Sequence, residues 1–243
     1  MNFKRRSCRR ELMDDPLLDT LLLQKVYTDI NRVNTVLHGF SLTLRAIEKI
    51  IEENPQNSYT IMDMGCGDGA MLAKVAAHYK NKPLHLDLIG VDLNSKSIAL
   101  AKENAKEYSN IRFLELDILG PEAKNLQCDI LLCTLTMHHF DSYEIPIFLD
   151  RFVKLSRLGI VINDLQRSKV SYYLFQLFSL IFIKTKIAKH DGLVSIKSAF
   201  TKLDLEAFSI NLPHVEHDIC WRWAFRYLWV MRIKGKQLPY GRD

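Results

Sequence analysis

The sequence predicts a doubly wound, mostly parallel α/β sheet of seven strands with a helical segment before it. Short apolar runs alternate along the chain with segments whose apolar residues recur at helical spacing. The apolar runs are nearly continuous, as expected for parallel strands that are buried on both faces. The first run leads into three glycines at alternate positions, Gly65, Gly67 and Gly69, and a helical pattern follows at once.

Length and charge fit one domain with a smaller cap. A chain of 243 residues can bury a substantial core, but two full domains would be cramped. The net charge of +5 resides in a short arm, because five lysines and arginines lie within residues 4–10, and the remaining 28 equal the 28 acidic residues. A neutral body argues against nucleic acid as a substrate. We expect the arm to be a mobile terminus, with contact to a membrane surface or partner as the alternative.

The cysteines and apolar runs predict a cytoplasmic protein without a membrane span. The five cysteines lack the close paired spacing of a zinc site, and we expect them to be unpaired in a reducing compartment. The basic start runs into acidic residues rather than into a secretory apolar stretch. The most apolar run, residues 171–183, is shorter than the about 20 residues that cross a bilayer.

Residues 1–55 are predicted to be the basic arm and a helical cap, and residues 56–243 the main domain. Asp14-Asp15-Pro16 is typical of a helix start, with an acid as cap and proline in the first turn. A second helical stretch at 31–38 ends at Gly39, and a third apolar stripe stops at Asn54-Pro55.

Strand and helix patterns alternate in the main domain as far as residue 162. Strands are predicted at 59–64, 84–91, 111–116, 128–134 and 158–162. A long, very apolar helix is then predicted at 169–189, within a lid segment at about 169–200. A helix at 202–208, an apolar 210–212 and the aromatic 220–232 follow, and two strands there form an antiparallel edge hairpin.

The glycine turn predicts a ligand site at the end of the first strand. Glycines let a small molecule lie against the backbone and the first N–H groups of the following helix. The turn alone fits a dinucleotide or S-adenosylmethionine. Asp92 ends the second strand and can accept hydrogen bonds from the ribose of either ligand.

Two further acids favour S-adenosylmethionine. Asp63 precedes the first glycine by two residues, where it suits a positively charged amino acid end but would repel a pyrophosphate. Asp117 ends the third strand and can accept from an exocyclic adenine amine. A Thr-Met-His-His-Phe segment follows the fourth strand, at the sheet edge where ligands bind in open α/β sheets.

Taken in order, these motifs resemble those of the class I S-adenosylmethionine-dependent methyltransferases over about residues 59–162. The resemblance implies a Rossmann-like methyltransferase fold and S-adenosylmethionine as cofactor. It also implies which residues bind each part of the cofactor: for the methionine end, Asp63, Gly65, Cys66, Gly67, Gly69 and the backbone of Thr134; for the ribose, Asp92 and Leu93; for the adenine, Asp117 and Ile118. Segments 11–15, 163–167 and 189–192 resemble a bacterial subgroup that acts on small molecules.

Histidine is the natural base if the methyl acceptor is a hydroxyl group. His139 is the preferred base and His138 the second candidate, with packing as the alternative role for both. Asp164, Arg167 and Tyr172 are predicted pocket residues. Asp141, Asp164 and His190 do not form a metal-binding pattern, so no metal is predicted.

The apolar residues 172–182 have two interpretations. They form the wall of a pocket for an apolar, aromatic acceptor, or they belong to the hydrophobic core. The predicted reaction is O-methylation in small-molecule biosynthesis. Carbon methylation of a quinol-like ring, a non-catalytic adenosyl-binding scaffold and an NAD-dependent oxidoreductase are the alternatives. Aromatic residues alternate with arginines at 221–229, which is typical of an edge strand, and peripheral contact with a membrane is the other interpretation. The sequence leaves the oligomeric state open.

Overall fold

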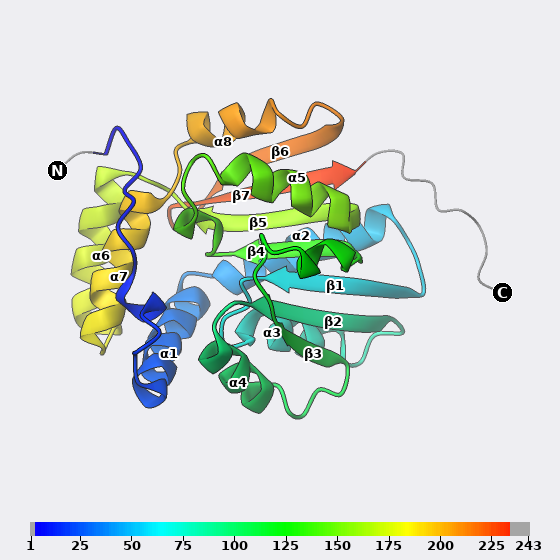
Figure 1. The fold of residues 1–243 in the computed structure, drawn as a ribbon, viewed down its shortest axis with the longest axis horizontal. Coiled ribbons are helices and arrows are strands. Elements are labelled where there is room, and N and C mark those ends of the chain that lie inside the picture. Colours follow the sequence, from blue (N-terminus) through cyan, green and yellow to red (C-terminus); the bar gives the residue numbers. More distant parts are fainter. Residues whose placement is uncertain (1–2, 234–243) are drawn as a thin grey trace.

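The computed structural model describes residues 3–233, apart from the side chains of residues 124 and 125. Its centre is a seven-stranded sheet with the order β3-β2-β1-β4-β5-β7-β6 (Figure 1). The first five strands pair in parallel, and β7 runs antiparallel to both β5 and β6. The predicted fold class is therefore confirmed, with one antiparallel hairpin. The strands are β1 (Ser58–Met64), β2 (His85–Asp92), β3 (Ile111–Glu115), β4 (Cys128–Thr134), β5 (Ser156–Leu165), β6 (Val215–Arg222) and β7 (Arg226–Ile233).

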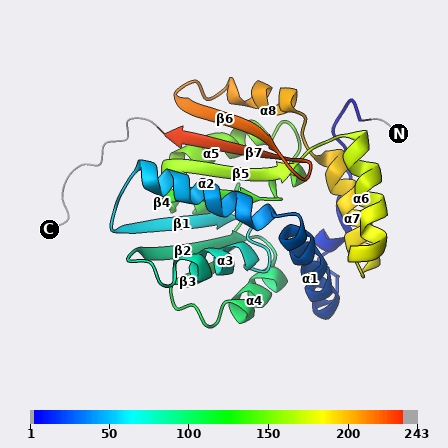
Figure 2. The ribbon, with the colours of Figure 1, turned by 180° about the vertical axis from the view of Figure 1, so that it is seen from behind.

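Helices cover both faces of the sheet. On one face lie α2 (Gly39–Glu53), α3 (Ala70–Tyr79) and α4 (Ser95–Asn104), and on the other α5 (Ile145–Leu155) and α8 (Lys202–Ser209) (Figures 1 and 2). Strand β1 supplies both cores, since Tyr59 and Ile61 pack into one and Met62 and Met64 into the other. Burial on both faces is the reason that this strand has no polar face.

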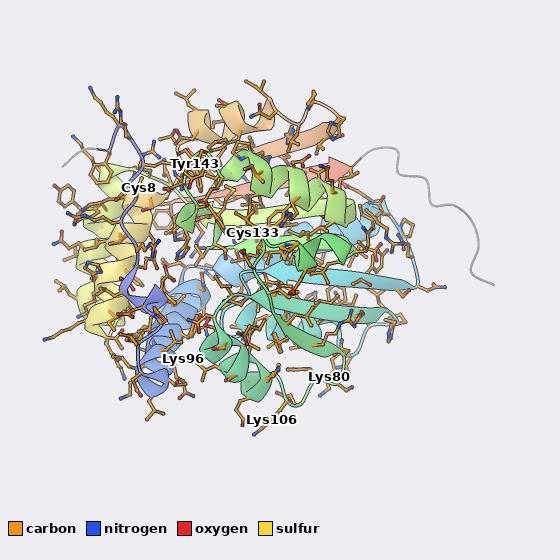
Figure 3. All side chains as sticks on the ribbon, in the orientation of Figure 1. Cys8, Lys80, Lys96, Lys106, Cys133 and Tyr143 are labelled. Carbon is orange, nitrogen blue, oxygen red and sulfur yellow. The ribbon has the colours of Figure 1, made fainter. Side chains whose placement is uncertain are left out.

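The N-terminal helices differ from the prediction. The helix start expected at Asp14-Asp15-Pro16 is wrong: residues Leu12–Asp14 form one 3-10 turn, and α1 spans Thr20–Val36 without a break at 31. Asp19 caps α1 by accepting a hydrogen bond from Leu22 N at 3.0 Å. Lys96 of α4, labelled in Figure 3, holds the loop that precedes α1, because its Nζ donates to the carbonyls of Pro16 and Leu18.

The basic arm is docked on the domain, so the prediction of a mobile terminus is wrong. Arg6 Nε donates to Ser198 O at 2.7 Å, and Arg6 Nη2 donates to His138 O and Phe140 O at 3.1 and 2.9 Å. The guanidinium also lies 4.4 Å from the centre of the Phe200 ring. The arm therefore joins the C-terminal end of the lid to the loop after β4, two segments far apart in the sequence.

The lid consists of two helices where the sequence predicted one long helix at 169–189. Helix α6 spans Lys169–Phe182 and α7 spans Lys186–Ser198, and they lie beyond the sheet edge at which β5 ends (Figure 1). Buried Asp29 of α1 accepts from Lys184 N and Thr185 N at 3.0 and 2.7 Å. Thr185 then caps α7 through Ala188 N. These contacts to the connecting residues explain the break.

The C-terminal hairpin is present, but its first strand begins later than expected. Residues 210–212 form the turn after α8, and β6 starts at Val215. Strand β6 is the sheet edge, whereas β7 is interior and fully buries Trp229. Within residues 3–233, the structure contains no helix with the length and hydrophobicity needed to cross a bilayer.

Candidate active site

A cavity of about 520 Å³ opens at the carboxyl ends of β1, β4 and β5. Residues from the glycine turn form one part of its lining, and residues from α1, α6, α7 and the β6–β7 turn form the rest. In Figure 1 the three helices lie together beyond this edge of the sheet. The α6 side of the cavity is apolar, lined by Leu174, Phe175, Leu177, Phe178 and Ile181.

The glycine turn has a backbone that only glycine adopts easily. Gly65, Gly67 and Gly69 have φ angles of +77°, +54° and +76°. A Cβ on Gly65 would lie 2.2 Å from Thr136 Cγ2, so the turn also has no room for a side chain. Gly65 N donates to Val91 O at 2.8 Å, which ties the turn to the end of β2.

Asp63 and Thr134 each have a polar side-chain atom without a hydrogen-bond partner among the described residues. These atoms, Asp63 Oδ1 and Thr134 Oγ1, are buried. Both residues line the cavity. Burial, together with the nearby charge of Asp92, raises the pKa of Asp63 to about 7. A cationic group bound in the cavity would satisfy this carboxylate.

Asp92 supports the turn from the neighbouring strand. Its Oδ2 accepts from Gly67 N at 2.9 Å, and its Oδ1 accepts from Asn94 N at 2.9 Å. Each carboxylate oxygen has a second lone pair, so both can still accept from a ribose. The ring of Tyr27 from α1 lies against Gly67, because a Cβ on Gly67 would be 2.9 Å from a ring carbon. The Tyr27 hydroxyl is hydrogen-bonded to Ser97 Oγ at 2.7 Å.

None of the predicted ribose and adenine residues lines the cavity, although Asp92 contacts the lining residue Gly67. Leu93 is exposed, and Asp117 is exposed and accepts from Leu119 N at 2.8 Å. Ile118 is buried in the core on the α5 face. Cys66, by contrast, lines the cavity, and burial raises the pKa of its thiol, so it is not a nucleophile.

His138 is fixed between two carboxylates. Its Nδ1 lies 2.7 Å from Asp164 Oδ1, and its Nε2 lies 3.3 Å from Glu11 Oε1. Burial alone would lower the pKa of His138, but Asp164 and Glu11 raise it to about 10. Both carboxylates thus favour the protonated form of His138, which disfavours this residue as the base and fits a structural role.

His139 lies beside the cavity and is partly accessible. Its Nδ1 lies 3.1 Å from Asp14 Oδ2, and its Nε2 lies 3.9 Å from Glu11 Oε2. Burial lowers the pKa of His139, but Glu11 and Asp14 outweigh this effect and raise it above its ordinary value. Of the two predicted histidines, His139 is the one that can exchange a proton with a bound molecule.

The three predicted pocket residues lie outside the cavity lining. Asp164 is occupied by His138. Arg167 is buried, donates to Phe3 O and Ala199 O at 3.0 and 2.6 Å, and pairs with Asp204 at 2.9 Å. Tyr172 packs edge-on against Phe3. Their hydrogen bonds and packing hold the arm and the lid, and the assignment of them as pocket residues is corrected accordingly.

The sequence reasoning missed four charged lining residues: Glu11, Asp68, Asp191 and Arg226. Glu11 reaches His138 across 127 positions, and no local pattern indicates such a contact. Its pKa is about 2, because the histidines and Ser195 overcome the effect of burial. Arg226 lines the cavity from β7. An arginine within an otherwise apolar strand is the sequence signal that could have indicated this residue.

Glu11, His138 and His139 also bring possible metal-ligating atoms within 4.8 Å of one another. The carboxylates beside both rings, however, favour protons on these nitrogens, as the raised pKa values indicate. Glu11 is also hydrogen-bonded to Ser195 Oγ. We therefore assign the three residues to an ion-pair network.

Residues 61–159 match the family model described as "Methyltransferase domain". This segment is a methyltransferase domain. It contains β1 to β4, the glycine turn, Asp92 and both candidate histidines, and it confirms the predicted class I S-adenosylmethionine-dependent family.

Curated relatives match a short stretch of the chain. The release factor glutamine methyltransferase of Haemophilus influenzae is 39% identical over 75 residues, which are 29% of this chain and 25% of that protein. The same enzyme of Fusobacterium nucleatum is 31% identical over 86 residues, 35% and 23% of the two chains. The chain thus spans about a quarter of the length of these relatives.

Solved methyltransferases share the fold over most of the chain. The plantazolicin methyltransferase BpumL, solved with SAH, has a TM-score of 0.66 at 16% identity, over 87% of this chain and 90% of that one. The magnesium protoporphyrin IX methyltransferase of Synechocystis PCC 6803, solved with SAH, has a TM-score of 0.56 at 14% identity, over 82% and 84%. At these identities the likeness establishes the Rossmann-like methyltransferase fold.

Proposed function

We propose that the protein transfers a methyl group from S-adenosylmethionine to a hydroxyl oxygen of a small, apolar, aromatic acceptor. The observation that carries this proposal is one continuous cavity. It joins Asp63 and the glycine turn to an apolar chamber under α6, with His139 in its lining. The five unpaired cysteines support a cytoplasmic location.

The residues at the glycine end fit the cofactor. Asp63 Oδ1 is a buried, unpaired acceptor that suits the ammonium group, and Gly65 and Gly67 line the cavity without a side chain of their own. Asp92 and Thr134 complete this set. When bound, S-adenosylmethionine supplies an electrophilic methyl group on a cationic sulfur, so the protein needs to align the acceptor and exclude water.

His139 is the proposed base. It accepts the hydroxyl proton at Nε2 while the acceptor oxygen gains the methyl group, and Glu11 and Asp14 stabilise the resulting imidazolium. The walls of the chamber, from α6 and the β6–β7 turn, hold the apolar body of the acceptor. No step of this scheme requires a metal.

The titles of the structural neighbours support a small acceptor. BpumL was solved with desmethylPZN analogues, and the Synechocystis protein is named for magnesium protoporphyrin IX. The release factor glutamine methyltransferases match only 29% and 35% of this chain, so their names give little guidance on its acceptor.

Incubation with methyl-labelled S-adenosylmethionine, a panel of phenols and EDTA tests the function. We expect labelled methyl ethers, identified by mass spectrometry and NMR. A label on ring carbon would indicate the quinol-type reaction instead. Binding of S-adenosylhomocysteine without any product would favour a scaffold, and tight NAD binding in its place would overturn the proposal.

The outer face of α6 is proposed to contact an anionic membrane surface. Val170, Tyr173 and Leu180 do not line the cavity, and they are 60%, 57% and 67% exposed. Between Asp164 and Asp191 the sequence has four lysines, one buried arginine and no acidic residue. Apolar side chains beside lysines match an anionic lipid interface, whereas a second copy would bring like charges together.

A further inference from the structure

Arg226 is a buried cation that faces the cavity without a counter-ion. It is the first residue of β7 and is only 2% exposed. Its Nη2 donates to Asn34 Oδ1 at 2.7 Å, which is a neutral partner. Its Nε and Nη1 atoms have no hydrogen-bond partner among the described residues, and Arg226 lines the cavity.

Within residues 3–233, no carboxylate forms an ion pair or hydrogen bond with this guanidinium. Asp164 is the carboxylate whose charge acts on Arg226. Asp164 makes its ion pair with His138, since Oδ1 binds the His138 ring and Leu165 N and Oδ2 accepts from His138 N; one lone pair of Oδ2 remains, but no ion pair or hydrogen bond joins Asp164 to Arg226 among the described residues. An unpaired buried charge is strongly unfavourable, so the free donors of Arg226 indicate a bound anion.

The surroundings of Arg226 favour an anion attached to an apolar body. Helix α2 begins beside it, since a Cβ on Gly39 would lie 3.1 Å from Arg226 Cζ, and no side chain caps this helix. The positive end of a helix adds to the attraction for an anion. Phe40, Trp223 and Phe225 line the same cavity.

We propose that Arg226 binds a carboxylate of the acceptor, so that the preferred substrate is an aromatic hydroxy acid. The hydroxyl part of this statement rests on the proposed function, whereas the anion site stands on Arg226 itself. Arg226 thereby selects acidic acceptors and orients them from the side opposite the glycine turn.

The carboxylate of the cofactor is the other possible anion, and the sheet order argues against it. Strands β1, β4, β5 and β7 are successive neighbours, which separates the axes of β1 and β7 by roughly 14 Å. Asp63 and the glycine turn lie at the end of β1 and are assigned to the amino acid end of the cofactor. Its carboxylate and ammonium groups share one carbon, so both belong at that end.

Calorimetry on the full chain saturated with S-adenosylhomocysteine tests the site. The probes are 1-hydroxy-2-naphthoate and its methyl ester, which differ in charge. We expect the acid to bind the unaltered protein roughly 10- to 100-fold more tightly than the ester, and Arg226→Gln to abolish this preference. The matched control is Arg222→Gln, which removes a cation of the same hairpin outside the cavity and keeps the preference.

Equal affinity of the unaltered protein for acid and ester would overturn the proposal without any variant. Weaker binding of S-adenosylhomocysteine to Arg226→Gln, with the acid preference kept, would instead assign Arg226 to the cofactor. If Arg226→Gln does not fold, Arg226→Lys keeps a charge and is expected to retain part of the preference. A preference for the acid in a protein that transfers no methyl group would refute the proposed function but not the anion site.

Discussion

Asp63 is a carboxyl group whose burial makes its charge depend on a ligand. Its pKa of about 7 is far above the ordinary value of 3.8. Between these two values the folded, ligand-free protein holds one proton more than the unfolded chain. Asp63 therefore lowers the free energy of unfolding as the pH rises through this window.

Cofactor affinity should rise with pH over the same range. The ammonium group of the ligand binds the ionised form of Asp63, so each pH unit below 7 weakens binding by up to about tenfold. Calorimetry with S-adenosylhomocysteine from about pH 5.5 to 7 checks this. Asp63→Asn should bind weakly at every pH, while Asp117→Asn, an exposed acid, should keep the slope. A flat profile for the unaltered protein contradicts the assignment.

Glu11 should set the pH dependence of methyl transfer through His139. Since Glu11 raises the pKa of His139, the rate is expected to rise with pH above 6.5 and to level off once the ring is neutral. Glu11→Gln removes the charge and should shift the rise to lower pH. Asp14→Asn should cause a smaller shift in the same direction.

The measurement is kcat as a function of pH at saturating cofactor. His139→Ala should lower kcat by roughly 10² to 10⁴. If the Glu11→Gln profile coincides with that of the unaltered protein, His139 is not the titrating base.

At the scale of elements, the lid depends on one side chain of α1. Asp29 accepts two backbone N–H groups at the break between α6 and α7. Asp29→Ala should lower the free energy of unfolding by roughly 2 kcal/mol, because it leaves both donors without their partner. Urea denaturation measures this, with Asp15→Ala as the control, since exposed Asp15 accepts one N–H of its own loop.

Helix α6 should bind vesicles through its outer face. The double variant Tyr173→Asp, Leu180→Asp should lose binding to vesicles of phosphatidylcholine with phosphatidylglycerol, measured by co-sedimentation. Leu203→Asp on α8 is the matched control, since Leu203 is 75% exposed and far along the chain. Equal binding of the double variant would exclude this face, and a dimer that the double variant dissociates would assign the face to a second copy.

The sequence predicted the elements whose signal is local. The five parallel strands, the glycine turn and α3 were predictable because apolar runs and glycines lie next to one another in the chain. The break in the lid was not, since it depends on Asp29, which lies more than 150 positions away. Glu11 and Arg226 were missed for the same reason, whereas Asp117 was overassigned because strand ends alone do not show which carboxylates face a cavity.

At the scale of the whole molecule, ligand binding and stability are coupled. The cavity wall is built from the arm, α1, the lid and the sheet, so a bound ligand holds all of them. S-adenosylhomocysteine at 100 times its Kd should raise the free energy of unfolding by about 2.7 kcal/mol. Thermal unfolding measures the shift, and NAD at equal concentration should produce none.

The contacts of Glu11 also constrain the order of synthesis. A ribosome makes Glu11 before its partners His138 and Ser195, which follow 127 and 184 positions later in the chain. The nascent chain can form the first strands and the glycine turn before the partners of the Glu11 carboxylate have been made. The protein therefore acquires a complete cavity only after Ser195 and Arg226 have been made, and products that carry residues 61–159 but stop before Ser195 should be inert.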